Sequence, residues 1–258
     1  MDTSCGRCDV SGHSKWAPIK RKKGAADAKR SNMFAKLLRA VEVAAREGGG
    51  NIEGNMTLAS AVEKARSFSV PSENIDRAIK RGTGELDGGA RYEEITYEGY
   101  APGGIALVVE ALTDNRNRTA QEVRHAFTRN GGNLGETGST LWMFQRKGVI
   151  VVDKAVAPDE DVLLDLALQG GAEDLADSES SWDIVTDPQD FKAVEAALRG
   201  AGVQASSAEI SLVPTTSIPV EGGEARHVLQ LIDALEELDD VQNVYANFDI
   251  PEEVMASL

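Results

Sequence analysis

Residues 92–112, YEEITYEGYAPGGIALVVEAL, indicate two β-strands joined by a tight turn. Alternating and β-branched residues favour strands over 92–99 and 105–112, and Ala101-Pro102-Gly103-Gly104 between them is typical of a turn. Helical patterns precede this segment, and strands mixed with helices follow it. The chain is therefore expected to be an α+β protein.

The part after residue 112 divides into strands and helices of ordinary length. The expected helices cover 119–129, 159–168, 190–198 and 224–238, and the expected strands cover 139–144, 148–152, 181–186, 207–213 and 241–248. The first two of these strands are predicted to form a hairpin over residues 145–147. Together the elements fit two ferredoxin-like α+β domains, in which helices cover one face of an antiparallel sheet. The pattern leaves open whether one domain is inserted in the other.

The part before residue 83 is predicted to be a three-helix domain, with helices over 25–47, 56–67 and 72–81. The first helix places one apolar stripe on one side, formed by Phe34, Leu37, Leu38, Val41 and Ala45. Gly48-Gly49-Gly50 ends it, because glycine leaves helical geometry easily. Residues 12–24 are predicted to be an extended arm, and residues 1–11 a disordered leader.

Positive charge is concentrated near the N-terminus. The whole chain has a formal net charge of −15, yet residues 13–39 hold nine basic residues against Asp27 alone. The nine are Lys15, Lys20, Arg21, Lys22, Lys23, Lys29, Arg30, Lys36 and Arg39. Residues 83–258 hold 11 basic and 33 acidic residues, so that part of the chain repels phosphate.

These nine cations, with Trp16, are the predicted nucleic-acid-binding residues. Lysine and arginine neutralise phosphates, and an exposed indole offers a stacking surface for an unpaired base. A solvated basic tail, or a tail whose Trp16 folds back onto the helices, is the alternative. A secondary phosphate contact is predicted at Arg116, Arg118 and Arg124. Asp114 and Asn115, just before them, are interpreted first as turn and helix-capping residues.

The sequence gives little support to an enzyme, a metal or a cofactor. Cys5 and Cys8 form a CxxC without two further ligands at zinc-site spacing. Glu122 and His125 form a lone ExxH, which lacks the second ExxH of a di-metal centre. We therefore expect no catalytic residue, metal or cofactor. Without an apolar run of membrane length or a signal peptide, a cytoplasmic protein with no membrane partner is expected.

Several long stretches resemble the YebC family, over about residues 11–251. They are residues 12–16, 19–20, 48–50, 97–104, 112–119, 122–125, 130–135 and 147–150. The resemblance implies three domains: an arm and helical domain over 12–82, a discontinuous α+β domain over 83–134 plus 208–251, and an α+β domain inserted over 135–207.

The resemblance also implies a non-enzymatic regulator of gene expression with no cofactor. Most members of the family carry the label of a probable DNA-binding transcriptional regulator, so DNA is the first expected partner. Mitochondrial members activate the translation of cytochrome oxidase, and bacterial relatives are linked to ribosomes stalled on peptides such as proline runs. Ribosomal RNA or tRNA is therefore the alternative partner, and the acidic α+β domains are expected to offer protein contacts.

Overall fold

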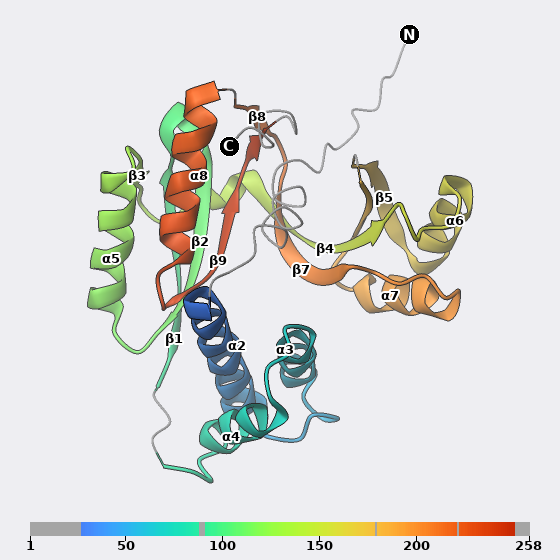
Figure 1. Ribbon diagram of the computed structural model, residues 1–258, viewed down its shortest axis with the longest axis horizontal. Coiled ribbons are helices and arrows are strands. Elements are labelled where there is room, and N and C mark those ends of the chain that lie inside the picture. The colour runs from blue at the N-terminus through green and yellow to red at the C-terminus, as the bar shows by residue number, and fades with distance from the viewer. Residues whose placement is uncertain (1–26, 88–90, 179, 221, 251–258) are drawn as a thin grey trace.

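The computed structural model describes residues 27–87, 91–178, 180–220 and 222–250, so the predicted leader and arm lie outside the described residues. Within them, a helical domain lies against one α/β domain, and a second α/β domain extends from it (Figure 1). The predicted α+β multidomain class is confirmed.

In the described residues, the helical domain consists of three helices: α2 (Asp27–Gly48), α3 (Met56–Ser67) and α4 (Ser72–Gly82). From the predicted stripe of α2, Leu37, Val41 and Ala45 are buried against apolar residues of the other two helices. Gly82 allows α4 to approach α2 closely, because a Cβ atom there would collide with the carbonyl oxygen of Glu42. The domain thus has its own small hydrophobic core.

The predicted hairpin after the helical domain is β1 (Glu93–Tyr100) and β2 (Ala106–Thr113), paired antiparallel along their full length. The turn between them contains the short 3-10 helix η1 (Pro102–Gly104). Gly103 and Gly104 have φ angles of +78° and +75°, a backbone region that favours glycine. The turn therefore requires the glycines that made it recognisable in the sequence.

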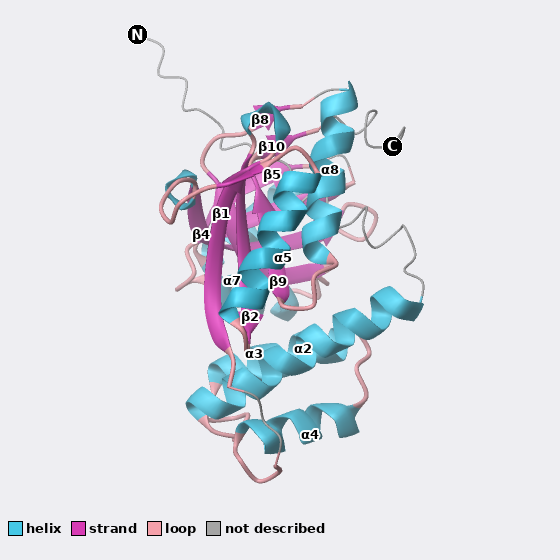
Figure 2. Ribbon diagram, turned by 90° about the vertical axis from the view of Figure 1, so that its left-hand side faces the viewer, coloured by secondary structure: helices cyan, strands magenta, loops and turns pink. Residues whose placement is uncertain are grey.

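This hairpin lies at the centre of the first sheet, whose strand order is β3-β1-β2-β9. Its outer strands are β3 (Asn133–Leu134) and β9 (Val241–Ala246), and helices α5 (Arg116–Arg129) and α8 (Gly222–Glu236) cover one face (Figure 2). Ile105, just before β2, and Leu107 and Val109 of β2 share one core with both helices. The layers match the prediction, but the strands connect differently from a ferredoxin-like domain, which has a hairpin strand at one edge.

The second sheet has the order β5-β6-β4-β7, and every neighbouring pair is antiparallel. Its elements are β4 (Phe144–Asp153), α6 (Glu160–Gly170), β5 (Ala172–Asp177), β6 (Ser181–Thr186), α7 (Phe191–Gly200) and β7 (Ser207–Pro214). This βαββαβ order is the ferredoxin-like arrangement. Both helices pack on the same face, around Ile150 and Ile184.

The structure differs from two expectations for this inserted domain. Strand β7 pairs with β4 from Ser207 to Pro214, so residues 208–214 belong to the inserted domain and not to the first α/β domain. Residues 144–153 form one strand, where the sequence predicted a hairpin over 145–147. Gln145, Arg146 and Lys147 are polar because they lie in a part of β4 that only β7 accompanies, away from the core.

The inserted domain leaves and rejoins the first sheet on the face opposite α5 and α8. Phe144 at the start of β4 and Leu212 near the end of β7 pack with Ala106, Val108 and Tyr245 of the first sheet. This small core therefore fixes both ends of the insertion. Beyond β7 the chain forms β8 (Ile218–Pro219), which pairs parallel with β10 (Phe248–Asp249).

Candidate nucleic-acid interface

The predicted arm contacts lie outside the described residues: Lys15, Trp16, Lys20, Arg21, Lys22 and Lys23. Lys29 and Arg30 are in the first turns of α2, but their side chains are not among those described. Their contact with phosphate therefore stays a prediction. The next two predicted residues, Lys36 and Arg39, are described in detail, and they turn inward.

Lys36 and Arg39 attach α2 to the C-terminal end of α8. Lys36 is 7% exposed, and its Nζ donates to the carbonyl oxygen of Glu236 at 2.5 Å. Arg39 donates to the carbonyl oxygens of Asp239 at 2.8 Å and Leu112 at 3.3 Å. The last carbonyls of a helix lack intrahelical donors and carry partial negative charge, so they attract cations. The sequence predicted that Lys36 and Arg39 contact phosphate. In the structure, both side chains instead form hydrogen bonds within the protein.

The buried carboxylate of Asp240 is the centre of this junction. Its Oδ2 accepts from Thr119 at 2.7 Å, Thr113 at 2.9 Å and Arg118 at 2.6 Å, and its Oδ1 lies 3.1 Å from Nη1 of Arg39. Burial raises the pKa of Asp240, but hydrogen bonds from Arg118, Thr119 and Thr113 outweigh it, so the pKa lies below its ordinary value. One carboxylate thus joins α2, β2, α5 and the start of β9.

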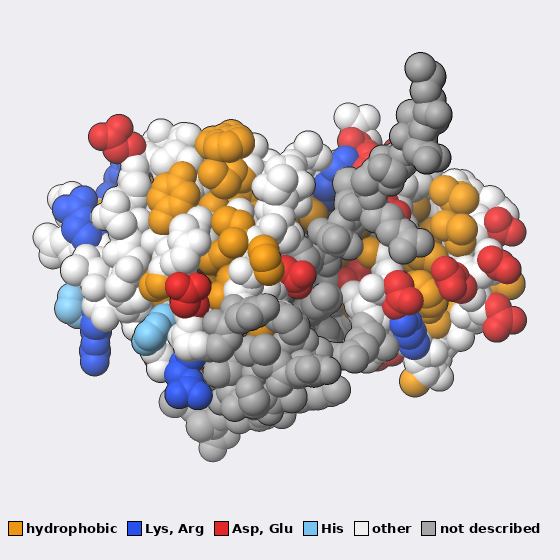
Figure 3. All heavy atoms as spheres, turned by 90° about the horizontal axis from the view of Figure 1, so that it is seen from above, with side chains coloured by type: hydrophobic (Ala, Val, Ile, Leu, Met, Phe, Trp, Pro, Cys, Tyr) orange, Lys and Arg blue, Asp and Glu red, His pale blue; other side chains and the backbone are white. Residues whose placement is uncertain are grey.

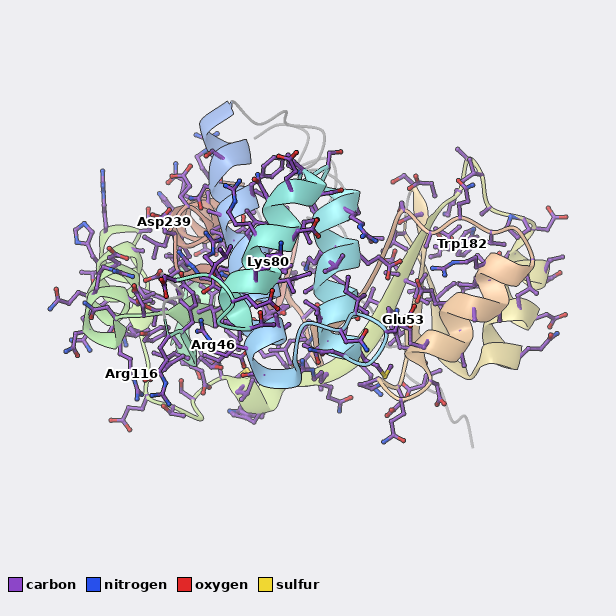
Figure 4. The ribbon with its side chains drawn as sticks, turned by 90° about the horizontal axis from the view of Figure 1, so that it is seen from below. Arg46, Glu53, Lys80, Arg116, Trp182 and Asp239 are labelled. Atoms are coloured by element: carbon purple, nitrogen blue, oxygen red, sulfur yellow. The ribbon has the colours of Figure 1, made fainter. Side chains whose placement is uncertain are left out.

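An open hollow of about 490 Å³ adjoins this network, and it is unsuited to phosphate. Its lining residues are Arg39, Tyr92, Asp114, Arg118, Glu122, Glu237, Leu238, Asp239 and Asp240. The five carboxylates outnumber the two guanidinium groups, and both arginines are already paired with Asp240. Figure 4 shows the labelled Asp239 on the same side of the molecule as Arg116.

The structure separates the three arginines of the predicted secondary contact. Asn115 caps α5 by accepting from the backbone N–H of Arg118 at 3.2 Å, as the turn interpretation predicted. Arg118 is bound to Asp240 while its side chain is 45% exposed, so its contact with phosphate also stays a prediction. Arg116 is 3.6 Å from Glu93 with a 70% exposed side chain, and Arg124 is exposed farther along α5. Arg116 and Arg124 stay predicted contacts.

The packed helical domain carries no excess of positive charge. Residues 31–87 hold eight basic and eight acidic residues, whereas residues 12–30 hold seven basic residues and one acidic residue. The buried Glu42 pairs with Arg46 and with Arg81, each at 3.2 Å. The exposed Arg77 and Lys80 of α4 each follow an acidic residue by one helical turn. The excess of positive charge that the sequence predicts therefore lies in residues 12–30.

A second buried carboxylate, Glu98, holds the loop before β4. It is 2% exposed and accepts from the backbone N–H groups of Gly138 at 2.6 Å, Thr140 at 2.7 Å and Leu141 at 2.7 Å. Burial raises the pKa of Glu98, but these donors outweigh it and bring the pKa below its ordinary value. The loop presents Trp142 with 71% of its surface exposed.

Replacing Glu98 with glutamine is expected to lower the free energy of unfolding by about 2 to 3 kcal/mol. The amide has one acceptor oxygen in place of two, so a buried backbone N–H group loses its charged partner. Urea unfolding followed by circular dichroism measures the change. Glu94→Gln is the control, since Glu94 is exposed on the same strand, and it should change the value by less than about 0.5 kcal/mol. Equal stability of both variants would contradict this role of Glu98.

Sequence reasoning missed Asp240, Glu98 and Trp142. Asp240 belongs to an acidic run near the end of α8, and nothing in that run distinguishes it from Asp239. Glu98 lies inside a recognisable stretch, but its burial depends on a loop 40 residues away. In the described part of the chain, no three His, Cys, Asp or Glu side chains are grouped to hold a metal ion. None of the described helices has the length and apolar character needed to cross a bilayer.

Comparison with known proteins places this geometry in a family. A model of the TACO1/YebC N-terminal domain matches residues 14–85, and a model of the TACO1/YebC second and third domain matches residues 92–248. A protein of Syntrophus aciditrophicus named "Probable transcriptional regulatory protein" is 52% identical over 96% of this chain and 99% of its own. One of Pelotomaculum thermopropionicum with the same name is 56% identical over 93% of this chain and 99% of its own.

The crystal structure of a conserved hypothetical protein from Aquifex aeolicus has the same fold. It aligns with a TM-score of 0.79 and 47% sequence identity, over 89% of this chain and 94% of that chain. The family models together span the helical domain and both α/β domains. The predicted resemblance is confirmed: this chain belongs to the TACO1/YebC family.

Proposed function

We propose that this protein is a non-enzymatic regulator of gene expression that binds nucleic acid through its basic segment, residues 12–30. The observation that carries the proposal is the distribution of charge. Seven of eight charged residues in this segment are basic, whereas residues 83–258 hold three times as many acidic as basic residues. A cationic segment attached to a largely acidic body concentrates phosphate binding in that segment. The relatives named as probable transcriptional regulatory proteins support the same class.

The inward position of Lys36 and Arg39 sharpens this proposal. These two cations hold α2 against α8, so the proposal assigns them to this junction and not to binding. The proposed contacts are therefore Lys15, Trp16, Lys20, Arg21, Lys22, Lys23, Lys29 and Arg30. Phosphate neutralisation supplies affinity, and Trp16 adds stacking on an unpaired base.

The first candidate target is DNA, in agreement with the names of the relatives. Structured RNA of the translation apparatus is the second candidate, and the helical domain favours it. Among the described residues, none of α2, α3 and α4 presents a row of cations free of carboxylates, as a helix in the DNA major groove commonly does. A basic segment with Gly, Pro and Trp suits folded RNA.

Sedimentation of cell extract distinguishes these targets. The protein at its natural level should travel either with the nucleoid or with ribosomes, and treatment with DNase or RNase should release it from the corresponding fraction. Release by high salt is expected in both cases, because the contacts are electrostatic. A protein that stays at the top of the gradient at low salt, without either partner, would contradict the proposal.

A further inference from the structure

A cationic surface lies on the acidic body at the end where α5 stops and α8 begins. It consists of Arg124, His125 and Arg129 from α5 and Arg226 and His227 from α8, all exposed. We call it the α5–α8 basic face. Figure 3, which views the molecule from above, shows basic and histidine side chains gathered at the left-hand end, where Figure 1 places α5.

Packing brings these two helix ends together. The side chains of α5 and α8 share one core, which contains Phe127 and Ala225. Gly131, just after α5, and Glu224, in the first turn of α8, both lie against the Pro102–Gly104 turn. The C-terminal half of α5 therefore lies beside the N-terminal half of α8.

Among the described residues, few carboxylates lie near this face. Glu122 is the only acidic residue of α5, and it lines the hollow at the Asp240 junction instead. In α8, Glu224 is beside the turn at Gly103, and the next acidic residue, Asp233, is about two helical turns after Arg226. The negative end of α8 is its other end, where Lys36 and Arg39 bind.

The arginines of this face differ from most other cations of the acidic body. Lys147 pairs with Glu173, Lys154 with Asp177, and both Lys192 and Arg199 with Glu195. By contrast, Arg124, Arg129 and Arg226 make no ion pair with any described residue. A group of like charges without counterions is unfavourable by itself and favours binding of a polyanion.

We infer that the α5–α8 basic face is a second phosphate-binding surface, which contacts the backbone of a nucleic acid already held by residues 12–30. This inference rests on the proposed function. Guanidinium groups bind phosphate oxygens in a bidentate manner, and imidazoles add hydrogen bonds. Asn32 of α2 donates to the carbonyl oxygen of Glu237 just beyond the far end of α8, and the 15 residues of α8 span about 22 Å. A nucleic acid that contacts both sites therefore extends along α8, over roughly six base pairs if it is a duplex.

The test uses the full-length protein and the triple variant Arg124→Gln, Arg129→Gln and Arg226→Gln. Its affinity for a 30-base-pair DNA duplex or for a 30-nucleotide unstructured RNA should fall at least about 10-fold at 0.15 M salt, because three phosphate contacts are lost. The probe that the wild-type protein binds with the higher affinity identifies the type of nucleic acid. A four-nucleotide probe, too short to reach both sites, should bind the variant and the wild-type protein equally.

The matched control is the triple variant Arg66→Gln, Arg77→Gln and Lys80→Gln, which changes the net charge equally on the exposed surface of α3 and α4. Its affinity for the long probe should change less than about threefold. If the wild-type protein binds the long probe and both triple variants bind it alike, the second surface is refuted while the proposed function stands. If the wild-type protein binds neither long probe, the proposed function fails, and this inference fails with it.

Discussion

Replacing Asp240 with alanine is expected to lower the free energy of unfolding by about 3 to 5 kcal/mol. The Asp240 side chain is 3% exposed and accepts from Arg118, Thr113 and Thr119, and its Oδ1 is paired with Arg39. Removing it leaves two guanidinium groups close together and two buried hydroxyl groups without their acceptor, and the loss of one partner from a buried pair typically costs this much. Urea unfolding measures the change.

Asp239→Ala is the control for this experiment. Asp239 is the exposed neighbour and contributes only its carbonyl oxygen to Arg39, so its replacement should cost less than about 0.5 kcal/mol. The pH gives a second readout with Asp240→Asn. Because the folded-state pKa of Asp240 is lowered, its stabilising effect is present above the unfolded-state pKa and is lost as the pH falls through the folded-state pKa. The wild-type advantage over Asp240→Asn should therefore shrink in acid. A difference that is constant from pH 7 to pH 3 would contradict the ionic role.

Replacing Lys20, Arg21, Lys22 and Lys23 with glutamine is expected to weaken nucleic-acid binding by about 100-fold or more at 0.15 M salt. Each lost phosphate contact removes the release of a counterion, and the four together make up more than half of the seven basic residues in 12–30. The thermal midpoint should stay nearly unchanged, because the proposal assigns these side chains to phosphate and not to the packed core. Fluorescence anisotropy with a labelled oligonucleotide measures the affinity.

The control variant carries the same change of net charge on the inserted domain: Lys147→Gln, Lys154→Gln, Lys192→Gln and Arg199→Gln. These residues form surface ion pairs, which contribute little to stability. The control should bind within about threefold of the wild-type protein. Equal losses in both variants would mean that total charge, and not the basic segment, governs binding.

Much of the fold could be predicted from local pattern. The apolar spacing of α2 and the turn between β1 and β2 depend on residues close together in the sequence, and both were predicted correctly. The assignment of residues 208–214 failed because strand pairing is a long-range property. Strand β7 pairs with β4, about 60 residues earlier, and the sequence of β7 does not indicate which strand it pairs with.

The candidate site could be predicted less completely, for a similar reason. Periodicity showed which side of α2 is apolar, but it does not show what lies on the polar side. The end of α8 lies there, so Lys36 and Arg39 are internal. In the same way, the helix ends that carry Arg129 and Arg226 are about 100 residues apart in the sequence and come together only when α8 packs beside α5.

The salt dependence of binding by the wild-type protein tests phosphate neutralisation by the basic segment most directly. If six or seven cations of residues 12–30 neutralise phosphates, log K should fall linearly with log salt concentration between about 50 and 200 mM, with a slope of about −4 to −6. The Gln variant of Lys20, Arg21, Lys22 and Lys23 should show a slope shallower by about 3. A wild-type affinity that does not change over this range would contradict phosphate neutralisation by the basic segment.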